Sequence, residues 1–454
     1  MSDVLADLPA FVSESEPWFR ASLRTLVEQA TISPGVTDKG PILAGVEVAA
    51  ALMRESGAEV EIVPSAGTPA LIARFSPPGH GAPKARIVVY NHLDVQPATA
   101  ENWEQDDPFR FEVREDQDRE VVYMGRGTTD DKGPALCALR AAEWVARHEL
   151  PIEVVLLWET EEEIGSPNFG EILEARKQLL AADAVIVSDT IWPSAGHPAI
   201  STGLRGGLLV SLSLRTGAAE THSGLTGGVA RNPLRELANL ASAIGDAEFW
   251  RLDALPPSQE EVESYLRTGF DAQYFRKSHR LEQLESDVPL EMMLRLWARP
   301  TFEIHGLVGG YTGPGIKSTI PATGELKASF RLVPNQNPRV LLDRLTSFVQ
   351  AFNPAVEVAE LGSFEPYRGH ITGPVHEAIV HGMTQGFGRE PALVREGGSI
   401  GAVPQMARVL GVPIHFLPLS LPEHCYHAPN ESFDWRQAKG GIASYVHTFA
   451  HLVG

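Results

Sequence analysis

The sequence predicts an α/β protein of two domains: a discontinuous domain with a mostly parallel sheet flanked by helices, and an inserted α+β domain. Two observations predict this. The chain has 454 residues, which is long for a single domain. Its first part alternates short apolar runs with helical patterns, whereas the pattern changes after Gly203 and resumes near Pro374.

Short, apolar and β-branched runs in the first part are typical of buried strands; they are 85–90 (ARIVVY), 152–158 (IEVVLLW) and 184–187 (AVIV). Between the first two runs, residues 133–147 carry apolar side chains at helical spacing. Strand, helix and strand in this order favour a parallel sheet. Because sites in such sheets form at the carboxyl ends of the strands, the polar residues that follow these runs are the candidates for function.

The middle of the chain has a different pattern. Residues 208–214 and 324–332 alternate like half-buried strands, while 233–244 and 338–352 predict amphipathic helices that begin with proline. After Pro374 the sequence predicts a helix at 375–383, a strand at 412–417 and a final helix at 435–451. We therefore predict that residues 1–203 and 370–454 form the discontinuous domain and that 204–369 form the inserted one.

Composition limits the possible partners. Lys and Arg number 38 and Asp and Glu 58, so the formal net charge is −20, which would repel a nucleic-acid backbone. No apolar run reaches the length of about 18 residues that a membrane span needs. The N-terminal stretch lacks a basic start followed by an apolar core, and two cysteines suit a reducing compartment. We expect a cytoplasmic protein without nucleic-acid or membrane partners.

Polar clusters follow the predicted strands. His92 and Asp94 are two residues apart, so on an extended segment they share a face, and the carboxylate can accept a hydrogen bond from the imidazole. In 125–133 (GRGTTDDKG), glycines frame Asp130 and Asp131 at a helix start, where one acid could equally be an N-cap. Both segments are therefore candidates for a site.

Three further acids, Glu161 to Glu163, follow the strand that ends at Trp158. Their mutual repulsion calls for a cation, and one carboxylate can bind metal while its neighbour acts as a base. Asp189 ends another buried strand, where it could also cap the next turn. The last cluster, 423–431 (EHCYHAPNE), offers His424, Cys425 and His427, and spacing alone does not choose among these three ligands.

Together the clusters offer imidazole and carboxylate ligands with no obligatory thiolate. Such ligand sets suit Zn²⁺, Mn²⁺ or Co²⁺. The candidate ligands are scattered along the chain from His92 to His427, which excludes a compact structural zinc module. This arrangement is typical of an open catalytic site, where two ions can share a carboxylate and a water.

The chain resembles the M20 family of metallopeptidases, most closely its carnosinase-like, cytosolic nonspecific dipeptidase branch. The resemblance rests on ordered motifs: YNHLDVQP, GRGTTDDKG, EEEIGS, Ser188-Asp189 and HAPNE, with GLRGG, THSG, GYTGPGIKSTIP, FRLVPN and REGGSI between them. It departs from the family pattern at Gly401, where a proline usually follows GGSI.

The resemblance implies two divalent ions per subunit, zinc or manganese with cobalt as an option, held by His92, Asp130, Glu163, Asp189 and His427. Asp130 would bridge the ions, with His92 and Asp189 on one and Glu163 and His427 on the other. Glu162 would be the general base, Asp94 the partner of His92, and the Asp130–Asp131 peptide would be cis. The family pattern thus selects His427 over His424 and Cys425.

The resemblance also implies a function and an assembly. His222 would reach the active site of a partner subunit, which predicts a homodimer through the inserted domain. Arg331, with Gly398 and Ser399, would bind the C-terminal carboxylate of a short peptide. The predicted activity is a dipeptidase or exopeptidase that uses a hydroxide bridging the metals. Alternatives are an N-acyl amino acid deacylase, a carboxypeptidase, or a non-catalytic binding protein on the same scaffold.

Overall fold

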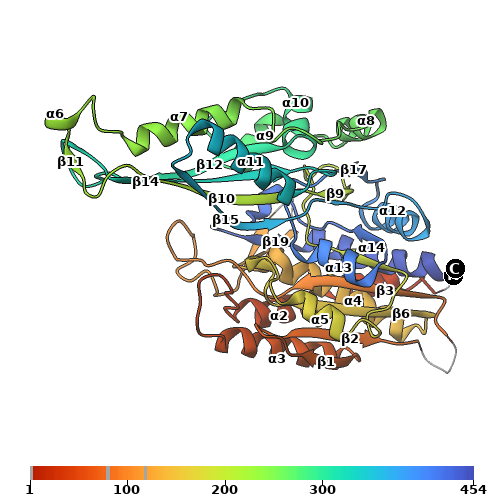
Figure 1. The fold of residues 1–454 in the computed structure, drawn as a ribbon. Coiled ribbons are helices and arrows are strands. Elements are labelled where there is room, and N and C mark those ends of the chain that lie inside the picture. Colours follow the sequence, from red (N-terminus) through yellow and green to blue (C-terminus); the bar gives the residue numbers. More distant parts are fainter. Residues whose placement is uncertain (1–3, 78–81, 117–119) are drawn as a thin grey trace.

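A computed structural model describes residues 4–77, 82–116 and 120–454 of the chain, which fold into two units (Figure 1). The first unit is built on a six-stranded sheet in the order β1 (Glu59–Val63), β2 (Ala70–Phe75), β6 (Ile152–Glu159), β3 (Ala85–His92), β7 (Ala184–Val187) and β18 (Ile414–Phe416). Four of these strands run parallel to one another: β6, β3, β7 and β18. At one edge, β2 pairs antiparallel with β6, and β1 pairs antiparallel with β2. The predicted mostly parallel sheet is confirmed.

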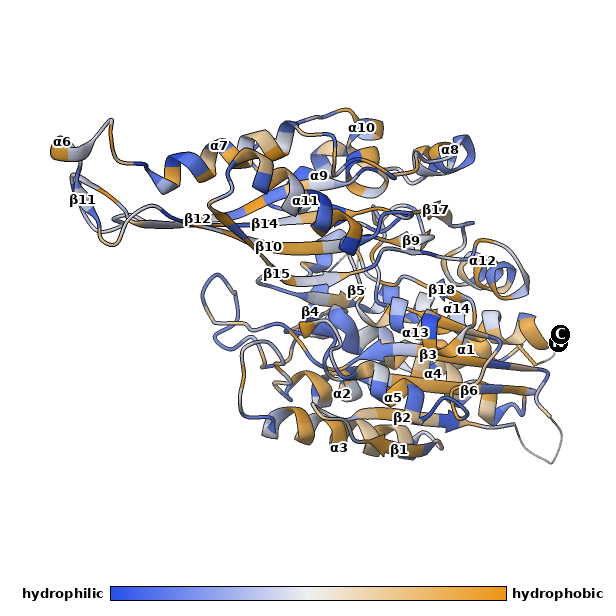
Figure 2. Ribbon diagram, viewed as in Figure 1, coloured by the Kyte–Doolittle hydropathy of each residue, from blue (hydrophilic) through white to orange (hydrophobic). Residues whose placement is uncertain are grey.

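Both faces of this sheet are covered, which explains the continuous apolar runs of its strands. Ile87, Val89 and their neighbours face one core cluster, and Val88 and Tyr90 face another. The first face packs against α1 (Leu8–Glu14), α2 (Glu16–Val27), α3 (Gly40–Glu55), α4 (Gly133–Arg147), α12 (Pro374–Phe387) and α14 (Trp435–Val453). The second packs against α5 (Phe169–Ala175) and α13 (Ala402–Leu410). Figure 2 shows the hydrophobic colour of β3 and β6 between these layers.

The second unit is an antiparallel sheet in the order β12 (Thr301–Val308), β14 (Thr323–Leu332), β10 (Gly206–Arg215) and β15 (Val356–Phe364). Helices α7 (Pro233–Asp246) and α11 (Pro338–Phe352) cover one face and close a separate core. Asn232 and Asn337 cap these helices through their side chains. At the far end of this unit, β11 (Thr221–His222), β13 (Thr319–Ile320) and α6 (Ser223–Thr226) form the tip of a projecting arm (Figure 1).

One part of the middle segment packs with the first unit. The segment that contains helices α8 (Gln259–Arg267), α9 (Ala272–Ser278) and α10 (Pro289–Met293), with the turns beside them, brings Tyr265, Phe270 and Trp297 into the core of the parallel-sheet unit. The packing of this segment on the first unit was not predicted from the sequence, because the periodicity of a short helix does not indicate which sheet the helix covers. The boundaries at 203 and 370 stay a prediction.

Short strands connect the layers. β4 (Glu112–Asp116), β5 (Glu120–Met124) and β19 (Ser432–Asp434) form one small sheet, and β8 (Ala199–Ser201) pairs with β17 (Ala392–Val394). β9 (Gly203–Leu204) pairs with β16 (Tyr367–Arg368), so the two strands that link the units lie side by side. Among the described residues, no helix combines the length and apolar character that crossing a bilayer requires.

Candidate metal centre and active site

The acidic and histidine clusters meet at the carboxyl ends of the parallel strands. Among the described residues, two groups have ligand atoms that all lie within 4.8 Å of one another: His92 with Asp130 and Asp189, and Glu163 with Asp130 and His427. Asp130 belongs to both groups. Segments far apart in the sequence therefore converge on one shared aspartate.

His92 is the last residue of β3, and its ring is completely buried. Its Nε2 lies 3.0 Å from Asp130 Oδ1 and 3.8 Å from Asp189 Oδ2. Its Nδ1 lies 2.9 Å from the backbone oxygen of Asp94 and 3.5 Å from the Asp94 carboxylate. The backbone oxygen is thus the nearer partner. With Nδ1 donating to it, Nε2 is left to face the carboxylates.

The Asp94 carboxylate also binds the turn that follows β6. It accepts hydrogen bonds from the backbone N–H of Glu162 at 3.1 Å and of Glu163 at 3.0 Å, and from the Ser33 hydroxyl at 2.6 Å. Glu162 and Glu163 begin the 3₁₀ turn Glu162–Ile164 that follows β6. Asp94 therefore fixes the turn that carries both glutamates, in addition to orienting His92.

Asp130 stands in the tight turn between β5 and α4, and its peptide bond to Asp131 is cis. Gly127 in this turn has φ +86°, and a Cβ there would lie 2.6 Å from Val95, so the turn requires glycine. Asp131 points to the sheet, where its Oδ2 accepts a 2.7 Å hydrogen bond from Asn91. The two adjacent acids thus have different surroundings, although the sequence alone does not separate them.

His427 completes the second group. Its Nε2 lies 2.9 Å from Asp130 Oδ2 and 3.1 Å from Glu163 Oε2, and its side chain is 54% exposed. His424 points elsewhere, with its Nε2 3.0 Å from Asp434 inside the core. Cys425 lies outside both groups. The geometry thus brings His427, and neither His424 nor Cys425, to the cluster.

The electrostatics of the cluster favour a cation. The pKa of Glu162 is raised well above its usual range, mainly because the group is buried and also because Asp189 and Glu163 repel its charge. The positive charge of His92 lowers the pKa of Glu162 but does not offset these effects. Burial also raises the pKa of Asp189 to about 7. The pKa of His427 is lowered by burial but raised more by Asp130 and Glu163, to about 11. These opposite shifts are expected where several carboxylates face too few positive charges.

The predicted carboxylate-binding residues also meet. An Arg331 Nη1 donates to Ser399 Oγ at 3.2 Å, and burial lowers the pKa of Arg331. Ser399 in turn donates to the backbone oxygen of Arg205, whose N–H donates to Gly398 O at 2.9 Å. Burial first, and then the charge of Arg331, lower the pKa of Arg205 to about 10. The Arg205 guanidinium itself donates to the backbone oxygens of Leu296 and Arg299. Arg331 is therefore the guanidinium of the two that is suited to a carboxylate.

His222 is the predicted residue that this chain does not bring to the cluster. It is exposed in β11, at the tip of the arm, and its Nδ1 accepts from Gly224 N at 3.0 Å. Figure 1 shows β11 at the tip of the arm, which projects beyond the first unit. Within this chain, His222 therefore lies apart from the other predicted site residues.

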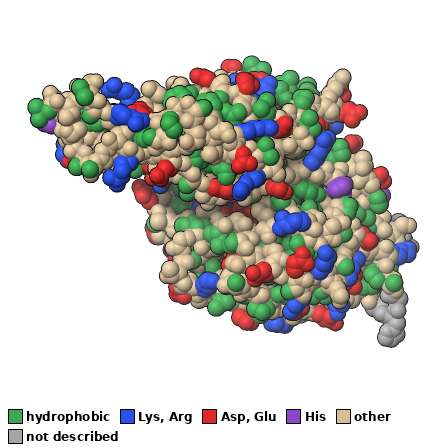
Figure 3. All heavy atoms as spheres, viewed as in Figure 1, with side chains coloured by type: hydrophobic (Ala, Val, Ile, Leu, Met, Phe, Trp, Pro, Cys, Tyr) green, Lys and Arg blue, Asp and Glu red, His purple; other side chains and the backbone are tan. Residues whose placement is uncertain are grey.

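A cavity of about 750 Å³ lies between the two units, with Glu163 and Gly165 on one side and Leu209 and Arg339 on the other. Figure 3 shows the corresponding recess between the units on this face. The candidate metal ligands therefore border a cavity that both units line, with Glu163 in its wall.

Comparison with known proteins places this geometry in a family. Residues 88–451 match the model of peptidase family M20/M25/M40. The chain belongs to this family. It is 30% identical over 399 residues to the Cys-Gly metallodipeptidase dug1 of Schizosaccharomyces pombe, with 82% of each protein covered. It is 27% identical over 442 residues to the Beta-Ala-His dipeptidase of Rattus norvegicus, covering 91% of this chain and 88% of the relative.

Solved M20-type structures share the fold. An M20 family metallo-carboxypeptidase from Sulfolobus solfataricus superposes with a TM-score of 0.84 at 26% identity, covering 95% of this chain and 98% of that one. The fold class and the family resemblance predicted from the sequence are thus confirmed. The matched region includes all five candidate ligands.

Sequence reasoning missed two groups at this M20 site. Glu431 is fully buried and accepts hydrogen bonds from Arg126 and from three backbone N–H groups of the Asp130 turn. Tyr426 donates from its hydroxyl to Asp189 Oδ1 at 3.0 Å. Both lie in the cluster 423–431, beside the candidate histidines. Their proximity to the candidate ligands in the sequence was the available signal.

Proposed function

We propose that this chain is a metal-dependent dipeptidase that hydrolyses the amide bond of short peptides with a free C-terminal carboxylate. The observation that carries the proposal is the pair of ligand groups that share Asp130, with Glu162 beside them. Relatives named as Cys-Gly and Beta-Ala-His dipeptidases support the same activity.

The residues fit a pair of divalent ions. The donors are imidazole nitrogens and carboxylate oxygens, and the excess of acids over histidines needs added positive charge. His92 and Asp189 would hold one ion, Glu163 and His427 the other, and Asp130 both. We propose zinc or manganese, with cobalt as a further option. Once bound, the ions would supply Lewis-acid polarisation of the scissile carbonyl and acidify the attacking water.

Glu162 would act as the proton carrier. Its carboxylate would take the proton of the attacking water and return it to the leaving nitrogen, so one group serves as base and then as acid. The hydrogen bonds from Glu162 N and Glu163 N to Asp94 hold this turn in place. Asp94 is thus a positioning residue in the proposal.

Arg331, Ser399 and Gly398 would bind the substrate carboxylate. The Arg331 guanidinium already contacts Ser399 and lies near the charge of Arg205. A planar guanidinium can grip a carboxylate through two parallel hydrogen bonds, which orients the peptide as well as attracting it. Such a subsite would select exopeptidase substrates.

We further propose a homodimer in which His222 of the partner subunit stabilises the developing oxyanion. The tip of the arm carries exposed apolar side chains, as expected of a surface that meets another subunit: Leu225 is 85%, Val229 90% and Ile316 96% exposed. Mixing a His222→Ala variant with a Glu162→Gln variant would test this. Partial recovery of activity in the mixture supports the shared site, and no recovery in verified mixed dimers contradicts it.

A carboxypeptidase activity on longer peptides is the second candidate. The similarity to the Sulfolobus solfataricus metallo-carboxypeptidase favours it. A panel of dipeptides, tripeptides and N-acyl amino acids, assayed with enzyme loaded separately with Zn²⁺, Mn²⁺ and Co²⁺, separates these activities. Dipeptide hydrolysis that exceeds the other two supports the proposal, while preferred cleavage of tripeptides or N-acyl amino acids contradicts it.

A cytoplasmic location is also part of the proposal. Cys137 and Cys425 form no disulfide in the described part of the chain, which agrees with a reducing compartment.

A further inference from the structure

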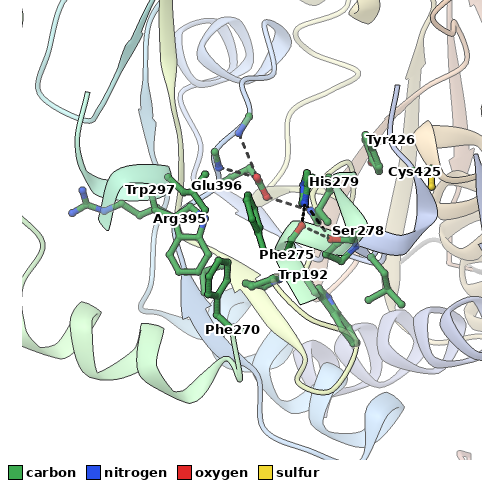
Figure 4. Close-up of a pocket in the computed structure, with 18 of the residues that line it drawn as sticks. Trp192, Phe270, Phe275, Ser278, His279, Trp297, Arg395, Glu396, Cys425 and Tyr426 are labelled. Atoms are coloured by element: carbon green, nitrogen blue, oxygen red, sulfur yellow. Dashed lines mark hydrogen bonds between the residues drawn. The ribbon is translucent and has the colours of Figure 1, made fainter. Parts of the chain in front are cut away.

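An apolar cavity of about 490 Å³ lies in the parallel-sheet unit, separate from the recess between the units. Its walls are dominated by Trp192, Phe270, Phe275, Trp297, Leu421 and Pro422. Figure 4 shows these aromatic side chains grouped around one space. Phe270, Phe275 and Trp297 come from the segment that contains α8, α9 and α10, whose packing on this unit the sequence did not predict.

The cavity adjoins the candidate metal ligands. Ile191 lies two residues after Asp189, and Tyr426 directly precedes His427; both line the cavity. The Tyr426 hydroxyl also donates to Asp189 at 3.0 Å. A substrate whose scissile carbonyl lies at the cluster could therefore extend a side chain into this space.

Three polar side chains of the wall, Glu396, Arg395 and His279, make contacts with other residues. The Glu396 carboxylate accepts from the backbone N–H of Gly397 at 2.8 Å and from those of Ile191 and Gly398 at 3.3 Å. Arg395 donates to Glu261 at 2.8 and 3.0 Å, and Figure 4 shows its guanidinium pointing away from the aromatic side chains. The His279 ring stacks on Phe275 with 4.2 Å between centroids. The remaining lining favours an apolar occupant.

The walls also indicate which part of the substrate enters. Arg331 and Ser399, which belong to the proposed carboxylate subsite, do not line the cavity. Gly398, the residue before Ser399, does line it, so the cavity and the carboxylate subsite are neighbours. With the substrate carboxylate at Arg331, the residue on the C-terminal side of the scissile bond lies between Arg331 and the cluster. The residue on the N-terminal side then faces the segments that flank Asp189 and His427.

We infer that this cavity binds a bulky apolar side chain, above all an aromatic one, of the residue on the N-terminal side of the scissile bond. This inference rests on the proposed dipeptidase function and names its substrate class. The relatives' names give Cys-Gly and Beta-Ala-His, in which the N-terminal residue is small. The lining of the cavity therefore assigns this chain a different preference.

The test compares matched dipeptides by kcat/KM with the metal-loaded enzyme. Phe-Gly and Leu-Gly should exceed Ala-Gly by about tenfold or more, because even one methylene in an apolar pocket changes kcat/KM by at least about that factor. Ser278, on α9, lines the cavity, and Ser278→Trp should fill it. This variant should lose about tenfold on Phe-Gly and stay within about twofold on Ala-Gly and Gly-Phe.

Lys277→Trp is the matched control, because Lys277 is the adjacent, exposed residue of the same helix and does not line the cavity. It should leave all three rates unchanged. Retained Ala-Gly turnover reports that Ser278→Trp is folded. Equal rates on Phe-Gly and Ala-Gly in the wild type, or a loss on Gly-Phe in place of Phe-Gly, overturns the inference alone. Absence of hydrolysis on every dipeptide overturns the proposed function, and the inference with it.

Discussion

Glu431 organises the turn that carries Asp130, and its replacement by glutamine tests that role. Its carboxylate accepts from Arg126 Nη1 at 2.7 Å and from the backbone N–H groups of Gly127, Thr129 and Asp130 at 2.9, 3.0 and 3.1 Å. Glu431→Gln keeps the size of the side chain but replaces one acceptor oxygen with an NH₂ group. That group would face donors, and Arg126 would lose its counter-charge.

The expected cost follows from burial. The Arg126 side chain is 4% exposed and that of Glu431 is 0% exposed. Removing one partner of a buried ion pair costs about 3–5 kcal/mol, because it leaves an uncompensated charge. Each buried N–H that loses its acceptor adds about 1–3 kcal/mol, unless the turn rearranges. We therefore expect Glu431→Gln to destabilise the protein by at least about 3 kcal/mol.

Urea unfolding of the metal-free protein measures this cost, and calorimetric titration with Zn²⁺ measures the effect on the site. Because Glu431 holds the backbone of Asp130, metal affinity should fall by about 10- to 100-fold. Glu423→Gln is the matched control, since Glu423 lies in the same segment and its carboxylate contacts Tyr274, outside the turn. A loss below about 1 kcal/mol with unchanged affinity would refute the role of Glu431.

Glu162→Gln should lower kcat by about 10²- to 10⁴-fold, because it removes the proton carrier. Elemental analysis should still find both metal ions in this variant. Near-normal turnover would exclude Glu162 as the proton carrier. Arg331→Lys should lower kcat/KM for dipeptides by about ten- to a hundredfold through loss of the two-pronged carboxylate contact, and an unchanged value would contradict it. Burial, with the charges of His376 and His370, lowers the pKa of His415 to about 4. The unfolded chain therefore binds more protons, and stability should fall by up to about 3 kcal/mol as the pH drops from 6.5 to 4. In His415→Gln this slope should be reduced in urea unfolding, and an identical slope would contradict the assignment.

The parallel sheet could be predicted because burial on both faces leaves continuous apolar strands. β3, β6 and β7 agree with the predicted runs to within two residues. The small connecting strands, such as β9 and β16, were missed because two-residue pairings carry no periodicity. The packing of α8 to α10 on the first unit depends on long-range contacts, which a local pattern does not contain.

For the site, sequence patterns located the segments but not the partners. The position of His92 and Asp189 at or just after the ends of apolar runs placed them at the carboxyl edge of the sheet. Spacing could not choose among His424, Cys425 and His427, because the choice depends on how the 421–431 segment turns; that choice came from the family resemblance. Glu431 was overlooked since a buried carboxylate that binds backbone N–H groups looks, in sequence, like any surface acid.

The contact between Arg331 and Ser399 has a consequence for how the two units cooperate. Arg331 belongs to β14 of the second unit, whereas Ser399 precedes α13 of the first. The units are linked through the paired strands β9 and β16, so a change in the angle between them would move these two side chains relative to each other. A carboxylate bound by both would draw the units together over the cluster, which excludes water and strengthens electrostatic interactions there. Substrates without that carboxylate would lack this closing contact, and selection for exopeptidase substrates would follow from the same geometry that assembles the site.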